Sequence, residues 1–73
     1  MNEHTIKTQE IIQHAAQMAQ GNQQQAVETG HVLKAILEEE PNTSQFLLNK
    51  LNISPGVLEN KLDHIISTYP KVS

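Results

Sequence analysis

The 73-residue sequence contains no cysteine, no tryptophan and no arginine, and it has a single phenylalanine, Phe46, and a single tyrosine, Tyr69. Without cysteine, the chain has neither disulfides nor thiolate metal ligands to reinforce a small core, a usage typical of a reducing compartment. With few aromatic rings and a net charge of −3, the chain has little with which to stack on bases or neutralise phosphates. We therefore expect a cytoplasmic protein that does not bind nucleic acid.

Long hydrophobic runs are also absent. The longest apolar runs contain two or three residues, whereas a membrane-spanning helix needs about 20. The polar start, Met1 to His4, lacks the apolar segment of a signal peptide. These features predict a soluble, unexported chain with no membrane partner. Its short length allows at most one domain, of modest stability.

The apolar residues that are present recur at helical spacing, and no window alternates as a strand would. The stretch from Ala26 to Glu40 is the clearest example, because four of its aliphatic residues fall on one helix face: Val32, Leu33, Ile36 and Leu37. The pattern predicts an all-α, four-helix array with short connections. The expected helices span residues 6–20, 30–40, 43–51 and 55–69.

Helix-start and helix-stop residues set these expected bounds. The expected N-caps share a side-chain oxygen that can accept from a free first-turn amide: Thr5, Thr29, Asn42 or Thr43, and Ser54. Pro55 suits the first position of the fourth helix. Gly21 is expected to end the first helix in the left-handed conformation. Pro41 is expected to stop the second helix.

The first predicted helix carries a broad apolar stripe. Four of its residues share the face expected to pack on a neighbour: Ile12, Ala15, Ala16 and Ala19. Ile11 and Met18 widen the stripe beyond what one neighbouring helix needs. Because an exposed methionine suits loosely specified apolar ligands, both are candidate ligand-binding residues, with core packing as the alternative role.

No group of residues has the spacing of a catalytic or metal site. The histidines are never three or four positions apart, so no helix face presents a pair of metal ligands: His4, His14, His31 and His64. The three glycines are isolated and form no phosphate loop. We expect His31 to pack or hydrogen-bond near the amino end of the second helix, and Glu38 to Glu40 to form a solvated rim. The chain is expected to be no enzyme and to hold neither metal nor cofactor.

Two other helical classes fit the sequence less well. An acyl carrier protein needs an Asp-Ser-Leu type motif at a helix start, but the candidate Ser54 lies between Ile53 and Pro55. A helix-turn-helix DNA reader needs basic groups that a chain without arginine lacks. The residues themselves therefore favour a helical protein-binding module.

Four segments carry a resemblance to a known family: Thr5-Ile-Lys-Thr-Gln-Glu10, Ala15-Ala-Gln-Met-Ala19, Val27-Glu-Thr-Gly-His-Val-Leu-Lys-Ala-Ile-Leu37, and Leu47-Leu48 with Leu51-Asn-Ile53. In this order they resemble the amino-terminal (Clp N) domain of the Clp/Hsp100 ATPases. The run from His31 to Leu33 resembles the start of that family's second helix, and the run from Leu51 to Ile53 resembles the turn before its fourth. Residues 65–73 resemble the protein-disaggregating members.

The resemblance implies a domain of two four-helix repeats, of which residues 1–73 would be the first. It implies a non-catalytic module that engages unfolded or aggregated polypeptide, or adaptor proteins, for a hexameric parent whose ATPase rings use ATP and Mg. The family's threonine at the start of the first helix contacts substrate, which points to Thr5. An isolated repeat would expose the face that its twin covers, so a homodimer is expected. The alternative is a stand-alone interaction module, for adaptor docking or as a spacer, that binds no substrate.

Overall fold

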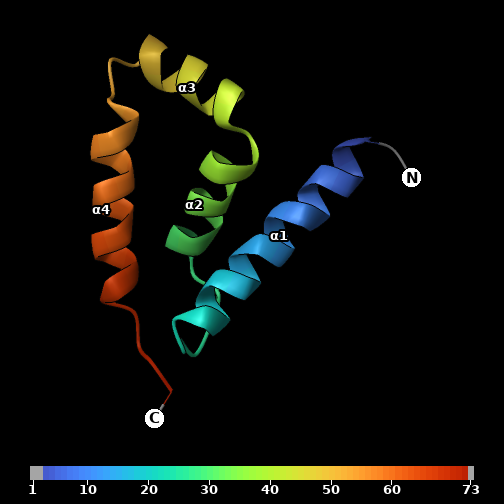
Figure 1. Ribbon diagram of the computed structural model, residues 1–73, viewed down its shortest axis with the longest axis vertical. Coiled ribbons are helices and arrows are strands. Elements are labelled where there is room, and N and C mark those ends of the chain that lie inside the picture. The colour runs from blue at the N-terminus through green and yellow to red at the C-terminus, as the bar shows by residue number, and fades with distance from the viewer. Residues whose placement is uncertain (1–2, 73) are drawn as a thin grey trace.

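The computed structural model describes residues 3–72, with side chains from residue 5 onward, so the polar start and the side chain of His4 lie outside the description. It contains four helices (Figure 1): α1 (Glu3–Gly21), α2 (Thr29–Glu39), α3 (Pro41–Lys50) and α4 (Pro55–Ser67). Over the described residues there is no strand, only an isolated antiparallel bridge between Gln24 and Lys71. The predicted all-α fold is confirmed. No helix in this part of the chain is long and apolar enough to cross a bilayer.

The expected caps of the first two helices are wrong. Thr5 lies inside α1, which already includes Glu3. Thr29 is the first residue of α2, and the cap is Glu28, whose backbone is extended. The residue at the third helical position, His31, completes this cap by accepting a hydrogen bond from the amide of Glu28 at 2.9 Å. Both helices therefore begin earlier in the chain than residue type alone predicts.

The start of α3 also differs from the expectation. Pro41 does not merely stop α2 but is the first residue of α3, after the cap residue Glu40. Proline is tolerated there because its missing amide would be unpaired in a first turn. The expected start of α4 at Pro55, after the cap residue Ser54, is confirmed, but the Ser54 side chain makes no capping hydrogen bond.

Two left-handed residues other than glycine turn the chain after α1 and α3. Gln23 has φ 57° and Asn52 has φ 58°. At both turns the amide of the next residue donates to the carbonyl oxygen five positions before it, at 2.9 Å, which satisfies a free carbonyl at the helix end. The turn expected at Asn52 is confirmed. The left-handed role expected of Gly21 is wrong, since Gly21 is helical and Gln23 takes that role.

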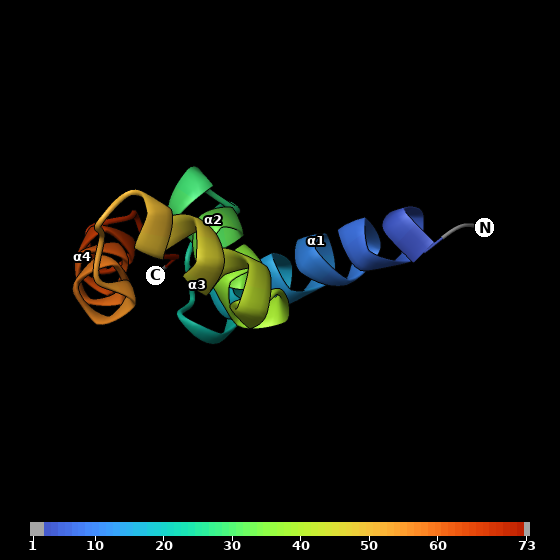
Figure 2. The ribbon, with the colours of Figure 1, turned by 90° about the horizontal axis from the view of Figure 1, so that it is seen from above.

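The helices form a single open layer. α2 contacts each of the other three helices, and α1 lies obliquely beside it, with its amino end far from α4 (Figure 1). Figure 2 shows α1 projecting beyond the other three helices. The chain measures 40 × 35 × 14 Å, and its shortest dimension is little more than the diameter of one helix, about 10–12 Å. Within residues 3–72, no second layer covers either face.

The buried apolar core is correspondingly small. Its members come from all four helices: Ala15, Ala19, Ala35, Leu48, Leu62 and Ile66. Three of the six are alanine, so α1 and α2 can approach closely but remove little apolar surface from water. Most of the larger aliphatic side chains stay exposed.

The packed face of α1 differs in part from the predicted one. Ala15 and Ala19 are buried as expected, with Ile11 half-buried on the same side. Ile12 is 58% exposed and Ala16 is also exposed, so the expectation that they pack is wrong. Because α1 packs mainly on α2, only a narrow stripe of the broad apolar surface is covered.

Candidate functional site

The most buried large side chain is that of His31, in the first turn of α2. Its Nδ1 accepts from the backbone N–H of Glu28 at 2.9 Å, so the ring proton is on Nε2. Nε2 donates to Oε1 of Gln24 at 2.5 Å, and Nε2 of Gln24 donates to the carbonyl oxygen of Ile66 at 2.5 Å. This chain of hydrogen bonds joins the loop after α1 to α2 and α4. The expected structural role of His31 is confirmed.

Burial lowers the pKa of His31 below its usual value, and the negative charge of Glu28 opposes this only in part. A second ring proton would have to sit on Nδ1, where it would displace the hydrogen bond from the amide of Glu28. It would also place a charge in the core. The folded state therefore holds the neutral ring.

We expect the stability of the fold to decrease as the pH falls below about 6.5. The unfolded chain has an ordinary histidine pKa and binds a proton that the folded chain resists, so the free energy of unfolding rises with pH in this range. The contribution of His31 to the free energy of unfolding is fully present above the pKa of the unfolded chain. It is lost as the pH falls toward the lowered pKa of the folded chain.

Urea unfolding between about pH 7.5 and 5.5 measures this dependence, above the range in which carboxylates titrate. Stability that stayed constant or rose as the pH was lowered would contradict the assignment. A proton NMR titration of the His31 ring provides the direct check.

Gly30 allows the segment after α4 to close against the start of α2. Its backbone N–H donates to Oη of Tyr69 at 3.0 Å, and the Tyr69 ring lies 5.2 Å from that of His31 between centroids. A β-carbon at position 30 would lie 2.6 Å from Oη of Tyr69 and 3.3 Å from Cγ1 of Ile66. The close approach therefore requires glycine. No feature of the sequence pattern predicts it, and α4 ends two residues earlier than expected, at Ser67.

Backbone hydrogen bonds hold the segment after α4 against the loop between α1 and α2. The amide of Gln25 donates to the carbonyl of Pro70 at 3.1 Å, and the amide of Val72 donates to that of Gln23 at 2.7 Å. These bonds flank the bridge between residues 24 and 71. The His31 ring is thereby enclosed, whereas Gln24 lines the pocket beside Met18.

His14 links the middle of α1 to the carboxyl end of α2. Its Nδ1 lies 2.8 Å from Oε1 of Glu39, and its Nε2 lies 3.1 Å from Oε1 of Glu38. Two of the three glutamates expected to form only a solvated rim therefore make a tertiary contact. Among residues 5–72, no group of three or more His, Cys, Asp or Glu side chains is arranged to hold a metal ion.

The three residues predicted to bind ligand all lie on α1 but do not share a pocket. Thr5 is exposed near the start of the helix, and Ile11 is half-buried. Met18 is half-buried and lines a pocket of about 270 Å³ beside the Lys34–Asp63 ion pair. A helix rises 1.5 Å per residue, so Thr5 and Met18 are roughly 20 Å apart along α1.

The depression lined most fully by aliphatic side chains lies between α2, α3 and α4 rather than on α1. We call it the leucine face, and define it by the residues that line it: Leu33, Ile36, Leu37, Ser44, Leu47, Leu48, Leu51, Leu58 and Leu62. Its volume is about 280 Å³, and no charged side chain lines it. Leu51 is 67% exposed, Leu47 54% and Leu33 46%. Leu48, Leu62 and Ser44 are buried at the base of this face, whereas Leu33 and Ile36, which share the apolar face expected for the second helix, stay exposed.

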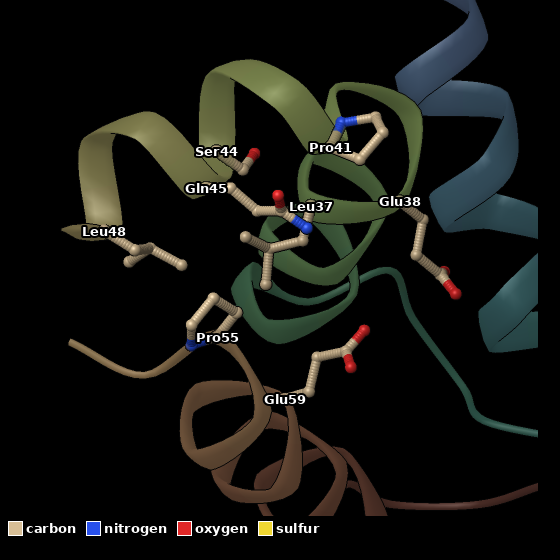
Figure 3. A pocket seen from close by; sticks show the side chains of 8 residues that line it. All are labelled: Leu37, Glu38, Pro41, Ser44, Gln45, Leu48, Pro55 and Glu59. Carbon is tan, nitrogen blue, oxygen red and sulfur yellow. The ribbon is translucent and has the colours of Figure 1, made fainter.

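A second pocket, of about 370 Å³, lies where the end of α2 meets α3 and the start of α4 (Figure 3). It shares Leu37, Ser44 and Leu48 with the leucine face. Figure 3 shows the carboxylates of Glu38 and Glu59 on the side of this pocket away from α3. The pocket is thus partly acidic, in contrast to the leucine face.

Comparison with known proteins gives a consistent result. Residues 3–73 match the family model described as the Clp repeat (R) N-terminal domain. Over 73 residues the chain is 34% identical to the chaperone protein ClpB of Porphyromonas gingivalis. This match covers all of this chain and 8% of that protein. It is 35% identical over 72 residues to ClpB of Bacteroides thetaiotaomicron, covering 99% of this chain and 8% of that protein. The chain thus spans about 8% of the length of these curated relatives. No solved structure matches it significantly.

Proposed function

The chain belongs to the Clp repeat N-terminal domain family, and from this membership we propose that it is a non-catalytic binding module that holds exposed apolar segments of unfolded or aggregated polypeptide. Its relatives are named as chaperone proteins. A module with this task needs accessible aliphatic surface and no reactive group. The observation that supports the proposal most is the amount of aliphatic surface that the open layer leaves uncovered.

We place the polypeptide on α1. Its amino half projects beyond the other helices (Figure 2), and Ile6 and Ile12 are exposed there, close in sequence to Thr5. Flexible apolar contacts without a fixed partner geometry suit a ligand whose sequence varies. Thr5, Ile11 and Met18 remain the proposed contacts, and Ile6 and Ile12 join them. Ile11 and Met18 are only partly exposed and offer less surface.

The remaining parts of the activity would belong to a longer parent protein. By analogy with ClpB, the parent would be a cytoplasmic, hexameric ATPase that uses ATP and Mg, and adaptor proteins would be further partners. Residues 3–72 contribute no phosphate-binding loop, because the glycines are isolated. This chain would therefore capture polypeptide and leave nucleotide hydrolysis to other domains.

We expect the 73-residue chain to bind reduced, carboxymethylated α-lactalbumin, which is unfolded, in preference to the native protein. Fluorescence anisotropy with a labelled substrate measures both affinities. Replacing Ile12 with serine removes an exposed aliphatic side chain and is expected to weaken binding about fivefold to tenfold. Thr5→Ala is expected to have a smaller effect, in the same direction.

Val57→Ser provides the matched control, because Val57 is also about half exposed but lies on α4. It is expected to leave binding unchanged. Equal affinity for unfolded and native protein would contradict the proposal and favour a docking or spacer role. Equal losses in Ile12→Ser and Val57→Ser, with helicity intact, would contradict the placement on α1.

A further inference from the structure

The pocket beside Met18 gathers positive charge in an acidic chain. We call it the lysine pocket, and define it by six of the residues that line it: Met18, Gln24, Lys34, Asp63, Ile66 and Lys71. Two of the chain's five lysines lie there, although the net charge of the chain is −3. Neither the leucine face nor the pocket of Figure 3 is lined by a lysine. The lysine pocket therefore differs from both in the ligands that it can attract.

The two lysines of this pocket differ in their partners. Nζ of Lys34 donates to Oδ1 of Asp63, and this hydrogen bond raises the pKa of Lys34, so the ammonium group stays charged. Lys71 has no ion-pair partner among residues 5–72. The bridge between Gln24 and Lys71 fixes the backbone of Lys71 beside the pocket. The pocket thus carries one lysine charge that no carboxylate of the described chain neutralises.

Gln24 adds a buried hydrogen-bond donor to this pocket. The residue is 8% exposed, and its Oε1 accepts from His31 while its Nε2 donates to the carbonyl oxygen of Ile66. A side-chain amide has two N–H donors, and within residues 5–72 the second has no acceptor. Leaving a buried donor without an acceptor is costly. The pocket therefore favours a ligand that brings an oxygen atom to Gln24.

We propose that the lysine pocket binds the free carboxyl end of the captured polypeptide, with an aliphatic last side chain against Met18. This inference rests on the proposed capture of polypeptide, in which Met18 is already a contact. The terminal carboxylate would accept from Lys71, from Lys34 and from the second N–H of Gln24. Charge-assisted hydrogen bonds of this kind are stronger than those between neutral groups. Charge complementarity thus selects an anionic group, and Met18 selects an apolar one beside it.

A chain end fits this pocket better than an acidic side chain within a polypeptide. At a chain end the carboxylate and the last side chain are attached to the same carbon atom, so both enter one pocket of about 270 Å³. Along an extended chain successive side chains point to opposite sides, so an internal acidic residue would turn its apolar neighbour away from Met18.

The residues before the chain end would lie along α1 toward Ile11. Ile11 lies seven positions before Met18 in α1, and this spacing places both on one face of the helix. The distance along the helix is about 10 Å, which about three extended residues span. The chain end at Met18 and the contact at Ile11 can therefore belong to one bound segment.

Fluorescence anisotropy with an amino-terminally labelled peptide tests the proposal. The probe is Gly-Ser-Gly-Ser-Ala-Leu with a free carboxyl end, and it is compared with the same peptide ending in a carboxamide. The carboxamide is expected to bind about tenfold more weakly, because it loses the charge-assisted interactions. A third peptide, Gly-Ser-Leu-Asp-Gly-Ser with a carboxamide end, carries its carboxylate on an internal side chain. It is expected to bind as weakly as the carboxamide form of the probe.

Lys71→Gln is expected to weaken binding of the free-carboxyl peptide about threefold to fivefold, as for an exposed ion pair, and to leave the carboxamide peptide unaffected. The matched control is Lys61→Gln, which removes the same charge from α4 outside the lysine pocket. It is expected to change neither affinity.

NMR of the wild-type chain provides a readout that depends on no variant. In proton–nitrogen correlation spectra, the side-chain amide signals of Gln24 are expected to shift on addition of the free-carboxyl peptide. The carboxamide peptide at the same concentration is expected to leave them in place. The signals report directly on the N–H group that is proposed to meet the carboxylate.

Three results would overturn the proposal: no stronger binding of the free-carboxyl peptide than of the carboxamide, equally tight binding of the peptide with the internal aspartate, or equal losses in the two lysine variants. The result with α-lactalbumin is separate. No preference for the unfolded protein, together with tighter binding of the free-carboxyl peptide, would contradict general capture and leave the lysine pocket standing. The reverse result would leave capture standing without this pocket.

Discussion

Replacing His31 with alanine is expected to lower the free energy of unfolding by about 3 kcal/mol or more, comparable to the truncation of a buried aromatic side chain. The ring is completely buried, so its removal leaves a cavity. It also leaves the backbone amide of Glu28 and Oε1 of Gln24 without their partners, and each unsatisfied buried group adds to the cost.

This loss is large for so small a domain. A chain of 73 residues has a total stability of about 4–11 kcal/mol, so His31→Ala is expected to unfold at much lower urea concentration. Urea unfolding followed by circular dichroism measures the change. The control is His64→Ala on the exposed side of α4, for which a change within about 0.5 kcal/mol is expected. Similar losses in the two variants would show that the buried hydrogen bonds do not hold the fold together.

Replacing Gly30 with alanine is expected to destabilise the fold by about 1–3 kcal/mol through overpacking. In an exposed helix the same change would stabilise by about 1 kcal/mol, because alanine has the higher helix propensity. The sign reverses here because the new β-carbon would lie 2.6 Å from Oη of Tyr69. Either the tyrosine must move, losing its hydrogen bond from residue 30, or α2 and α4 must separate.

A double-mutant cycle with Tyr69→Phe isolates this contact. Tyr69→Phe alone is expected to cost about 1 kcal/mol for the lost hydrogen bond. In its background, Gly30→Ala is expected to be nearly neutral, because the atom that the methyl group would meet is gone. Thermal unfolding of the four proteins gives the coupling energy. Additive losses would mean that the hydroxyl is not the obstacle and that the contacts at 3.3 Å, with Cγ1 of Ile66 and Cε2 of the Tyr69 ring, set the limit.

The helices could be predicted from the sequence because apolar periodicity depends on which face of a segment is turned from solvent. All four were expected within two or three residues of their observed bounds. The caps were predicted less well, because the start of a helix depends on which acceptor reaches a free amide and not on residue type alone. At α2 that acceptor is the ring of His31, three residues into the helix, and not the hydroxyl of Thr29.

The tertiary contacts could not be predicted in the same way. Gln24 belongs to a run of polar residues that the sequence presents as a solvated loop, yet its side chain is buried between α2 and α4. Burial of an amide depends on partners that are distant in sequence, here His31 and the carbonyl of Ile66. For the same reason the sequence does not show that Leu33 and Ile36, on the apolar face of α2, stay exposed. Periodicity shows that one side of a helix is apolar but does not show whether anything covers it.

The hydrogen bond between Gln24 and the carbonyl of Ile66 also has a kinetic consequence, because it joins residues 42 positions apart. Individual helices form within about a microsecond, and α1, α2 and α3 are joined by short connections. Bringing α4 back to the loop after α1 instead closes a long segment of chain, at an entropic cost that grows with its length. Docking of α4 is therefore expected to be the step that limits how fast the chain folds.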